Sequence, residues 1–141
     1  MLDISLIEKH EGFSSTPYLC PAGVPTIGIG STFYEDGTKV TLNDKPITLE
    51  RARELARWYC ENEVKYPRKD LNDDQKIAIC SLIFNIGPDA FDKSKCRKAI
   101  VEGNWAEAHR QWDWIRSKGK IMPGLVLRRQ EEKELFFKDL I

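Results

Sequence analysis

A stretch punctuated by glycine and proline, from Glu8 to Thr32, constrains the fold of this chain more than any other. Apolar residues at helical spacing precede it and predict a short amphipathic helix over residues 3–11, ended by Gly12 in the left-handed conformation. From residue 18 to 39 apolar residues lie between glycines, a pattern typical of short strands. A helix end beside a small β region is therefore predicted.

The rest of the chain indicates a larger helical part. The Asp36-Gly37 pair predicts a hairpin turn with residues 38–41 as the returning strand. Five further helices are then expected from caps, apolar periodicity and closing glycines or prolines, over residues 49–65, 77–84, 94–102, 104–115 and 125–138. Residues 118–124 are expected to form a loop. The prediction is one α+β folding unit of two lobes, a β lobe at 13–46 and a helical lobe at 66–141 that includes the N-terminal helix.

Composition and charge exclude several classes of protein. The 141 residues suffice for one domain with a core, and 41% hydrophobic and 31% charged residues are ordinary for a globular protein. Net charge is zero, which gives no support for a nucleic-acid partner. The last third is locally basic and could suit an anionic polymer or form a solvated helical face; its cations are Arg116, Lys118, Lys120, Arg128 and Arg129. Neither a membrane-spanning segment nor a secretion signal is seen.

The four cysteines differ in their surroundings. They have no CxxC spacing, so a zinc site is not expected. Cys60, Cys80 and Cys96 fall among apolar residues of predicted helices and are expected to be buried in the core. Cys20 lies in a turn rich in proline and glycine, outside any apolar period. It is the cysteine that the pattern leaves available for chemistry.

Glu11 is the candidate acid. A carboxylate at the C-terminal end of a helix meets the negative end of the helix dipole, which disfavours the ionised form and suits a general acid. Cys20 and Thr26, presented by one turn, could hold a water opposite such an acid, the arrangement used in inverting glycoside hydrolysis. Taken singly, each is as well explained as a surface glutamate, a turn cysteine and a strand threonine.

Two other functions stay open on the residues alone. A cysteine hydrolase would use Cys20 as nucleophile with His10 or His109 as base, because a free thiol is a weak nucleophile at neutral pH. A glycan-binding module would have the same fold with catalysis lost at position 20. The two histidines give the hydrolase little support, since His109 lies between Ala108 and Arg110 on a predicted helix.

Several motifs together resemble the phage-type lysozymes, the endolysin muramidases of glycoside hydrolase family 24. The first combines Glu11-Gly12-Phe13, Tyr18, Cys20 and the run Pro25–Gly30, in which a glutamate, a cysteine and a threonine have the family's spacing. The second is Phe84–Gly87. The third, in the last helix, consists of Gly124-Leu125, Arg128-Arg129, Glu132 and Leu135-Phe136. The resemblance covers essentially the whole chain.

The resemblance implies a two-lobe lysozyme with the helix near residues 49–65 joining the lobes and a cleft between them. It implies hydrolysis of the β-1,4 bond between N-acetylmuramic acid and N-acetylglucosamine in peptidoglycan at host lysis. Glu11 would protonate the glycosidic oxygen and Thr26 would position the water, while Arg128 or Arg129 could pair with Glu11. The candidate sugar contacts are Thr32, Phe84, Asn85 and Gln111.

Position 20 departs from the commonest form of the family, where aspartate is frequent. Family members with cysteine at this position imply that activity is retained, with Cys20 either polarising water or acting as a transient nucleophile. No cofactor or metal is implied. The chain begins near the catalytic helix without an anchor, so no stable membrane insertion is expected. A monomer is also expected. It would move from the host cytoplasm to the cell wall once a separate holin-type protein permeabilises the membrane.

Overall fold

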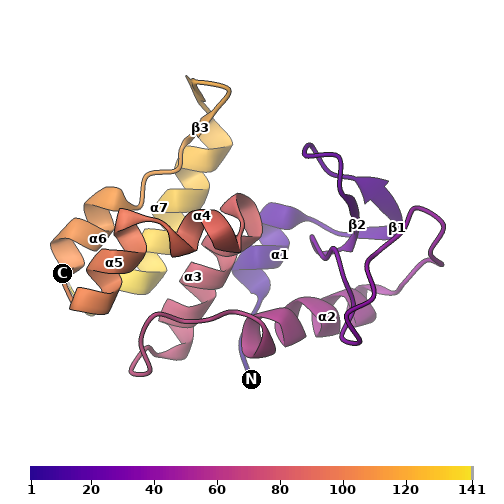
Figure 1. Ribbon diagram of the computed structural model, residues 1–141, viewed down its shortest axis with the longest axis horizontal. Coiled ribbons are helices and arrows are strands. Elements are labelled where there is room, and N and C mark those ends of the chain that lie inside the picture. The colour runs from indigo at the N-terminus through magenta and orange to yellow at the C-terminus, as the bar shows by residue number, and fades with distance from the viewer. Residues whose placement is uncertain (141) are drawn as a thin grey trace. The chain divides into compact units, whose positions relative to one another are not determined.

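The computed structural model describes residues 1–140, which form two compact units, one from Met1 to Val64 and the other from Lys65 onward (Figure 1). The described residues contain seven helices and four short strands, an α+β composition in agreement with the sequence prediction.

The first unit opens with helix α1 (Ser5–Glu11), close to the predicted 3–11. Gly12 ends it, and its N–H donates to the Glu8 carbonyl at 2.8 Å. The expected left-handed conformation is wrong in detail, since Gly12 has φ 73° and ψ −172°. This region is open almost only to glycine, so Gly12 both stops the helix and turns the chain into the first strand.

Strands β1 (Ser14–Leu19) and β2 (Pro25–Gly28) form the antiparallel hairpin of this unit, with Tyr18 opposite Thr26. Strand β1 starts earlier than predicted and has an irregularity between Ser14 and Tyr18. The turn at Asp36-Gly37 is confirmed, because the Gly37 N–H donates to the Tyr34 carbonyl. The returning strand at 38–41 is wrong. Only the isolated bridge between Phe33 and Lys39 forms there, since few residues pair across so tight a turn.

Helix α2 (Leu49–Asn62) follows the hairpin in the sequence and packs against β2. Thr48 caps it as predicted by accepting the Arg51 N–H at 3.1 Å. The helix ends before the predicted residue 65 and well before Pro67, at the C-cap Glu63. Its buried side chains are Ala52, Leu55, Ala56 and Cys60. The small Ala52 lets β2 approach closely, because a Cβ built on Gly28 would lie 3.0 Å from the Ala52 Cβ.

The second unit is built on helices α3 (Asp73–Ile86) and α7 (Pro123–Phe137), which pack together. The capping box of Asn72 and Gln75 is confirmed in both directions, at 2.8 and 2.9 Å. Helix α3 is buried over most of its length, as expected of a core helix apolar on all sides. Each fully buried Ile or Leu contributes about 1.5–3 kcal/mol to folding.

Three shorter helices complete this unit: α4 (Pro88–Asp92), α5 (Lys95–Glu102) and α6 (Trp105–Gln111). Helix α5 has its predicted cap Ser94 and closing Gly103, whereas α4 was not predicted. Helix α6 stops at residue 111 instead of 115, with Trp112 at its C-cap. The second capping box is only half formed. Asn104 accepts the Glu107 N–H, while the Glu107 carboxylate accepts from Gln111 and Arg110.

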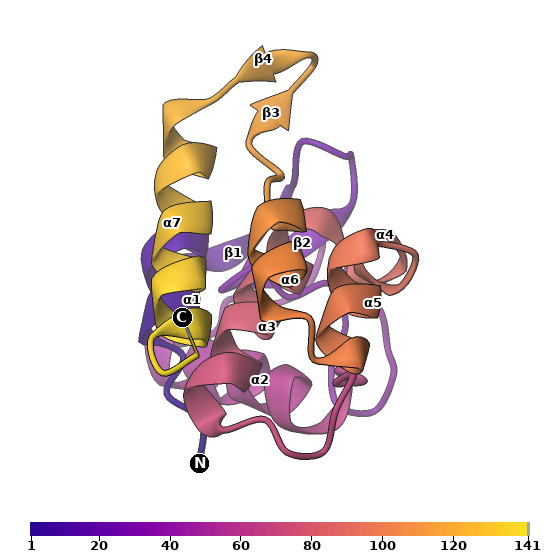
Figure 2. The same ribbon diagram turned by 90° about the vertical axis from the view of Figure 1, so that its left-hand side faces the viewer.

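The predicted loop at 118–124 is wrong at its start, because a small hairpin forms there. Strands β3 (Arg116–Ser117) and β4 (Lys120–Ile121) pair across a turn at Lys118-Gly119. Figure 2 shows this hairpin beyond the ends of α6 and α7. Helix α7 then begins at Pro123, which suits the first turn of a helix because proline lacks the N–H that would be unpaired there.

Aromatic side chains fill the core between α6 and α7. The ring centroids of Trp112 and Phe136 lie 5.2 Å apart, and those of Phe136 and Phe137 lie 4.7 Å apart. Cys96 is also buried in this unit, and Cys60 and Cys80 are buried in their helices, so the predicted burial of these three cysteines is confirmed.

Candidate active site

Glu11 is the last residue of α1, where the sequence analysis placed it. Its side chain is half-buried, and Gly12 directly after it leaves no Cβ to cover it. The carbonyl groups that end the helix concentrate partial negative charge at this point. The position therefore sets a carboxyl group at the negative end of the helix dipole.

Cys20 lies in the turn between β1 and β2. The turn is closed by the Cys20 N–H donating to the Val24 carbonyl at 3.0 Å and the Gly23 N–H donating to the Cys20 carbonyl at 2.8 Å. The backbone N–H of Val24 is the main cause of a lowered pKa at the Cys20 thiol, and the Ala22 N–H and the Thr26 hydroxyl add to it. This turn is thus a small nest of donors that stabilises a thiolate.

Thr26 lies on β2, paired with Tyr18 of β1, and only 3% of its surface is exposed. Its hydroxyl donates to the Val24 carbonyl at 2.9 Å. The same hydroxyl contributes to the lowered pKa of the Cys20 thiol. Its oxygen lone pairs remain available to accept a hydrogen bond from a water.

Tyr18 belongs to the same group, although the sequence analysis assigned it no role. Burial raises the pKa of its phenol, and the negative charges of Glu11 and Cys20 raise it further. The charges of Glu11 and Cys20 therefore both influence the Tyr18 phenol, and Thr26 lies opposite Tyr18 in the hairpin. The alternation along β1 could have indicated Tyr18, because it shares a face with its cross-strand partner Thr26.

Thr32 lies just beyond this group in the same unit. It is half-buried, and its carbonyl accepts the Val40 N–H at 2.9 Å. The neighbouring Phe33 makes edge contacts with Trp58 and Tyr59, at centroid distances of 6.0 and 5.8 Å. Thr32 is therefore anchored through its backbone, and its contact with sugar stays a prediction.

In the second unit, Arg128 and Arg129 are buried around Glu132. Arg129 donates to both Glu132 oxygens, at 2.7 and 2.9 Å, and Arg128 donates to the Ser81 carbonyl at 2.8 Å. Ser81 and Trp112 also donate to the Glu132 carboxylate, at 2.5 and 3.1 Å. The predicted pairing of one of these arginines with Glu11 stays a prediction.

Glu132 is the residue of this cluster that the sequence analysis passed over. It appeared there only as part of a motif, yet it is fully buried and gathers donors from α3, α7 and the segment after α6. Arginines three and four residues before a glutamate on one helix were the available signal. A buried charge needs such partners, so the cluster fixes how α7 packs on α3.

The remaining candidate sugar contacts also lie in the second unit. The Asn85 side-chain oxygen accepts from Arg129 at 2.8 Å, which orients its amide nitrogen away from the arginine. Gln111 donates to Glu107 at 2.9 Å, and Phe84 is half-buried near the end of α3. Asn85 is therefore joined to the buried cluster, whereas Gln111 is tied to its own helix.

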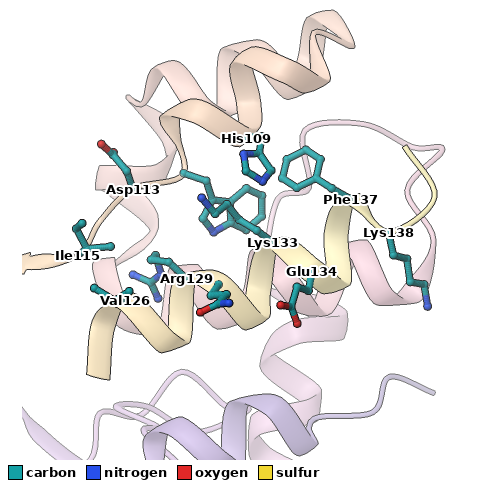
Figure 3. A pocket seen from close by; sticks show the side chains of 11 residues that line it. His109, Asp113, Ile115, Val126, Arg129, Lys133, Glu134, Phe137 and Lys138 are labelled. Carbon is teal, nitrogen blue, oxygen red and sulfur yellow. The ribbon is translucent and has the colours of Figure 1, made fainter. Parts of the chain in front are cut away.

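A groove of about 730 Å³ lies beside α6 and α7 in this unit. Figure 3 shows His109 next to Phe137, with Lys133 and Arg129 along the same side. The two rings of His109 and Phe137 are 5.1 Å apart, and burial lowers the pKa of His109. Of the residues that the sequence analysis singled out, Arg129 and His109, the candidate base of a cysteine hydrolase, line this groove.

In residues 1–140, no group of three or more His, Cys, Asp or Glu side chains is arranged to hold a metal ion. None of the helices in that range has the length and apolar character to cross a membrane.

Comparisons with known proteins place the chain. The family model described as phage lysozyme matches residues 8–132. The endolysin of Salmonella phage P22 is 34% identical over 137 residues, covering 94% of this chain and 93% of that protein. The solved endolysin from Escherichia coli O157:H7 phage FAHEc1 has a TM-score of 0.74 at 27% identity, covering 97% and 91% of the two chains. The muramidase domain of SpmX from Asticaccaulis excentricus has a TM-score of 0.69 at 30% identity, covering 96% and 98%.

The fold and these relatives define a lysozyme-type hydrolase. This chain belongs to the phage lysozyme family.

Proposed function

We propose that this protein is a phage endolysin that hydrolyses the β-1,4 bond between N-acetylmuramic acid and N-acetylglucosamine in peptidoglycan. The observation that carries the proposal is that Glu11 ends α1 while Cys20 and Thr26 share the hairpin that follows, in a chain of the phage lysozyme family. The muramidase named among the structural relatives supports this choice of bond. The relatives favour neither the glycan-binding module nor the cysteine hydrolase.

Glu11 would act as the general acid that protonates the departing sugar oxygen. A sugar leaving as an alkoxide is a poor leaving group, so a proton delivered in the transition state speeds the reaction by about 10²–10⁴-fold. The anomeric carbon becomes positively charged as the bond breaks.

Cys20 and Thr26 would serve the other side of the reaction. A thiolate held by the backbone donors of its turn supplies a negative charge, as an aspartate does in other members of the family. That charge stabilises the oxocarbenium-like transition state, and the Thr26 oxygen accepts a hydrogen bond from the attacking water and so positions it. A transient bond between the Cys20 sulfur and the anomeric carbon is the alternative role for this residue.

We further infer a monomer that accumulates in the host cytoplasm and reaches the wall after a separate holin-type protein opens the membrane. The absence of a membrane-spanning helix in residues 1–140 is consistent with this route. Lysis of intact cells would then require permeabilisation, whereas purified peptidoglycan would be cut directly.

The test is the loss of turbidity of permeabilised Gram-negative cells. Glu11→Gln removes the transferable proton with little change of shape, and we expect activity to fall by about 10²-fold or more. Glu50→Gln, an exposed position on α2, is the matched control and should retain wild-type activity. A Glu11→Gln variant that lyses cells as fast as wild type would remove Glu11 from the acid role.

A further inference from the structure

The hairpin of β3 and β4 gives this protein a projecting basic surface. Its base is closed by the Met122 N–H donating to the Ile115 carbonyl at 2.9 Å, and Arg116 pairs with Ile121 across it. Every residue from Arg116 to Gly124 is exposed. In Figure 2 the hairpin extends past the C-terminal end of α6 and the start of α7, at the end of the unit. We call residues Arg116–Leu127 the basic tip.

The charge of the basic tip is of one sign. Arg116, Lys118 and Lys120 are all exposed, and no acidic residue occurs between Asp113 and Glu131. Arg128 and Arg129, which follow, are buried and bound to Glu132. Three positive charges therefore concentrate on the tip of a chain whose net charge is zero. Such a local excess attracts an anionic surface.

Apolar side chains are exposed at the same end of the unit. Ile121 is 56% exposed and Leu127 48%, and Met122 and Val126 are also exposed. They occupy β4, the residue after it and the first turns of α7. Cations beside exposed apolar side chains are the composition of surfaces that lie in the interface of a lipid bilayer. A hydrated anionic polymer would bind the cations but would leave these apolar groups exposed to water.

The turn has a lysine at a position whose backbone conformation disfavours any residue with a Cβ. Lys118 has φ 52°, the one positive φ of a non-glycine residue in residues 1–140, and Gly119 follows with φ 79°. A two-residue turn with positive φ at both positions prefers Asn-Gly. Lysine in the left-handed region is disfavoured, because its Cβ lies too close to the following carbonyl oxygen. Residues held against local preference are frequently functional, and here the result is a charge at the extremity of the hairpin.

We propose that the basic tip docks the protein on bilayers that expose anionic phospholipid headgroups. The three cations would meet the headgroup phosphates, and Ile121, Met122, Val126 and Leu127 would enter the boundary between headgroups and acyl chains. The binding would be peripheral and reversible. It would hold the enzyme at the membrane surface that faces its substrate, and it is separate from the chemistry at Glu11.

The test is cosedimentation with vesicles of phosphatidylglycerol and phosphatidylethanolamine, compared with vesicles of phosphatidylcholine alone. Wild-type protein should bind the anionic vesicles and leave the neutral ones largely free. Each cation near an anionic surface contributes about 1 kcal/mol, so replacing Arg116, Lys118 and Lys120 by Gln should weaken binding about a hundredfold. The control is Lys93→Gln, Lys95→Gln and Lys98→Gln together, which removes three exposed charges elsewhere in the same unit.

Two further variants separate charge from fold and from apolar contact. Lys118→Asn should keep or raise the melting temperature, because asparagine suits the turn, and should weaken vesicle binding about fivefold. The double variant Ile121→Ser and Met122→Ser should weaken vesicle binding although it retains every charge. Hydrolysis of purified, lipid-free peptidoglycan should stay unchanged in all of them.

Equal binding of wild type and the triple Gln variant to anionic vesicles would overturn the proposal. The proposal would also be overturned if wild type did not bind vesicles but bound lipid-free peptidoglycan, and if the triple Gln variant lost that binding. That result would assign the basic tip to an anionic polymer. A failure of the membrane proposal leaves the Glu11 assay unaffected.

Discussion

Residue 20 is a cysteine, and a thiol ionises less readily at neutral pH than the carboxyl group of an aspartate would. The turn compensates with the N–H groups of Val24 and Ala22 and the hydroxyl of Thr26, which together lower the pKa of Cys20. A thiolate can then supply a negative charge at a lower pH than an ordinary thiol. Cys96 shows the opposite environment, because burial raises its pKa to about 12.

Alkylation by iodoacetamide tests this difference. Only the thiolate reacts, so we expect the rate at Cys20 to rise with pH with a midpoint below the 9.0 of an unperturbed thiol. Cys96 should stay unmodified over the same range while the protein is folded. Peptide mapping by mass spectrometry after timed quenching measures both sites. A midpoint at or above 9.0 for Cys20 would contradict the stabilised thiolate.

At the scale of elements, the site depends on how closely β2 approaches α2. Gly28 ends β2 with φ 68°, and a Cβ there would lie 3.0 Å from the Ala52 Cβ and 3.1 Å from the Ile47 Cδ1. The strand that carries Thr26 is therefore held directly against the helix. A methyl group at Gly28 would fit only if Ala52 or Ile47 shifted by a few tenths of an ångström.

Gly28→Ala should destabilise the protein by about 2–5 kcal/mol, combining the backbone cost of a positive φ with overpacking against α2. Gly37→Ala is the matched control, because Gly37 has φ 86° but nothing within 4 Å of its added Cβ. It should lose only the backbone part, about 1–2 kcal/mol. Urea unfolding measures both variants. Equal losses in the two would show that the contact with α2 does not matter.

The elements that the sequence predicted well are those with local signals. Thr48, the pair Asn72 and Gln75, and Ser94 identify helix starts because caps act within three residues. The returning strand at 38–41 and the continuation of α6 to 115 were wrong, since pairing and packing beyond the segment decide them. The hairpin at Lys118-Gly119 lacked the usual Asn-Gly or Asp-Gly signal and was missed for that reason.

The candidate site could be predicted from the sequence to about the same degree as the fold. The positions of Glu11, Cys20 and Thr26 follow from a helix end and one turn, which are local features. Tyr18 and Glu132 were missed because their importance arises from neighbours on other elements. Long-range partners of this kind leave no periodic pattern in a single sequence.

At the scale of the whole molecule, the charges balance in number but not in place. Equal numbers of acidic and basic residues leave three exposed cations on the basic tip, while two arginines are buried around Glu132. The second unit thus has a core with a charged centre. That centre joins α3 to α7 and to the segment at Trp112.

Glu132→Gln should lower the free energy of unfolding by about 3–5 kcal/mol, because it leaves two buried arginines without their carboxylate. Glu134→Gln, two residues along the same helix and exposed, should change it by less than about 0.5 kcal/mol. Chemical denaturation followed by tryptophan fluorescence measures both, since Trp112 donates to Glu132. A Glu132→Gln variant as stable as Glu134→Gln would refute the structural role of the cluster.

The proposed reaction is tested most directly by mass spectrometry of the fragments released from purified peptidoglycan. Cleavage by proton transfer from Glu11 and attack of water predicts fragments that end in reducing N-acetylmuramic acid, formed by wild type and nearly absent with Glu11→Gln. Fragments ending in anhydro-muramic acid, in reducing N-acetylglucosamine or in newly freed amines would contradict the proposed reaction.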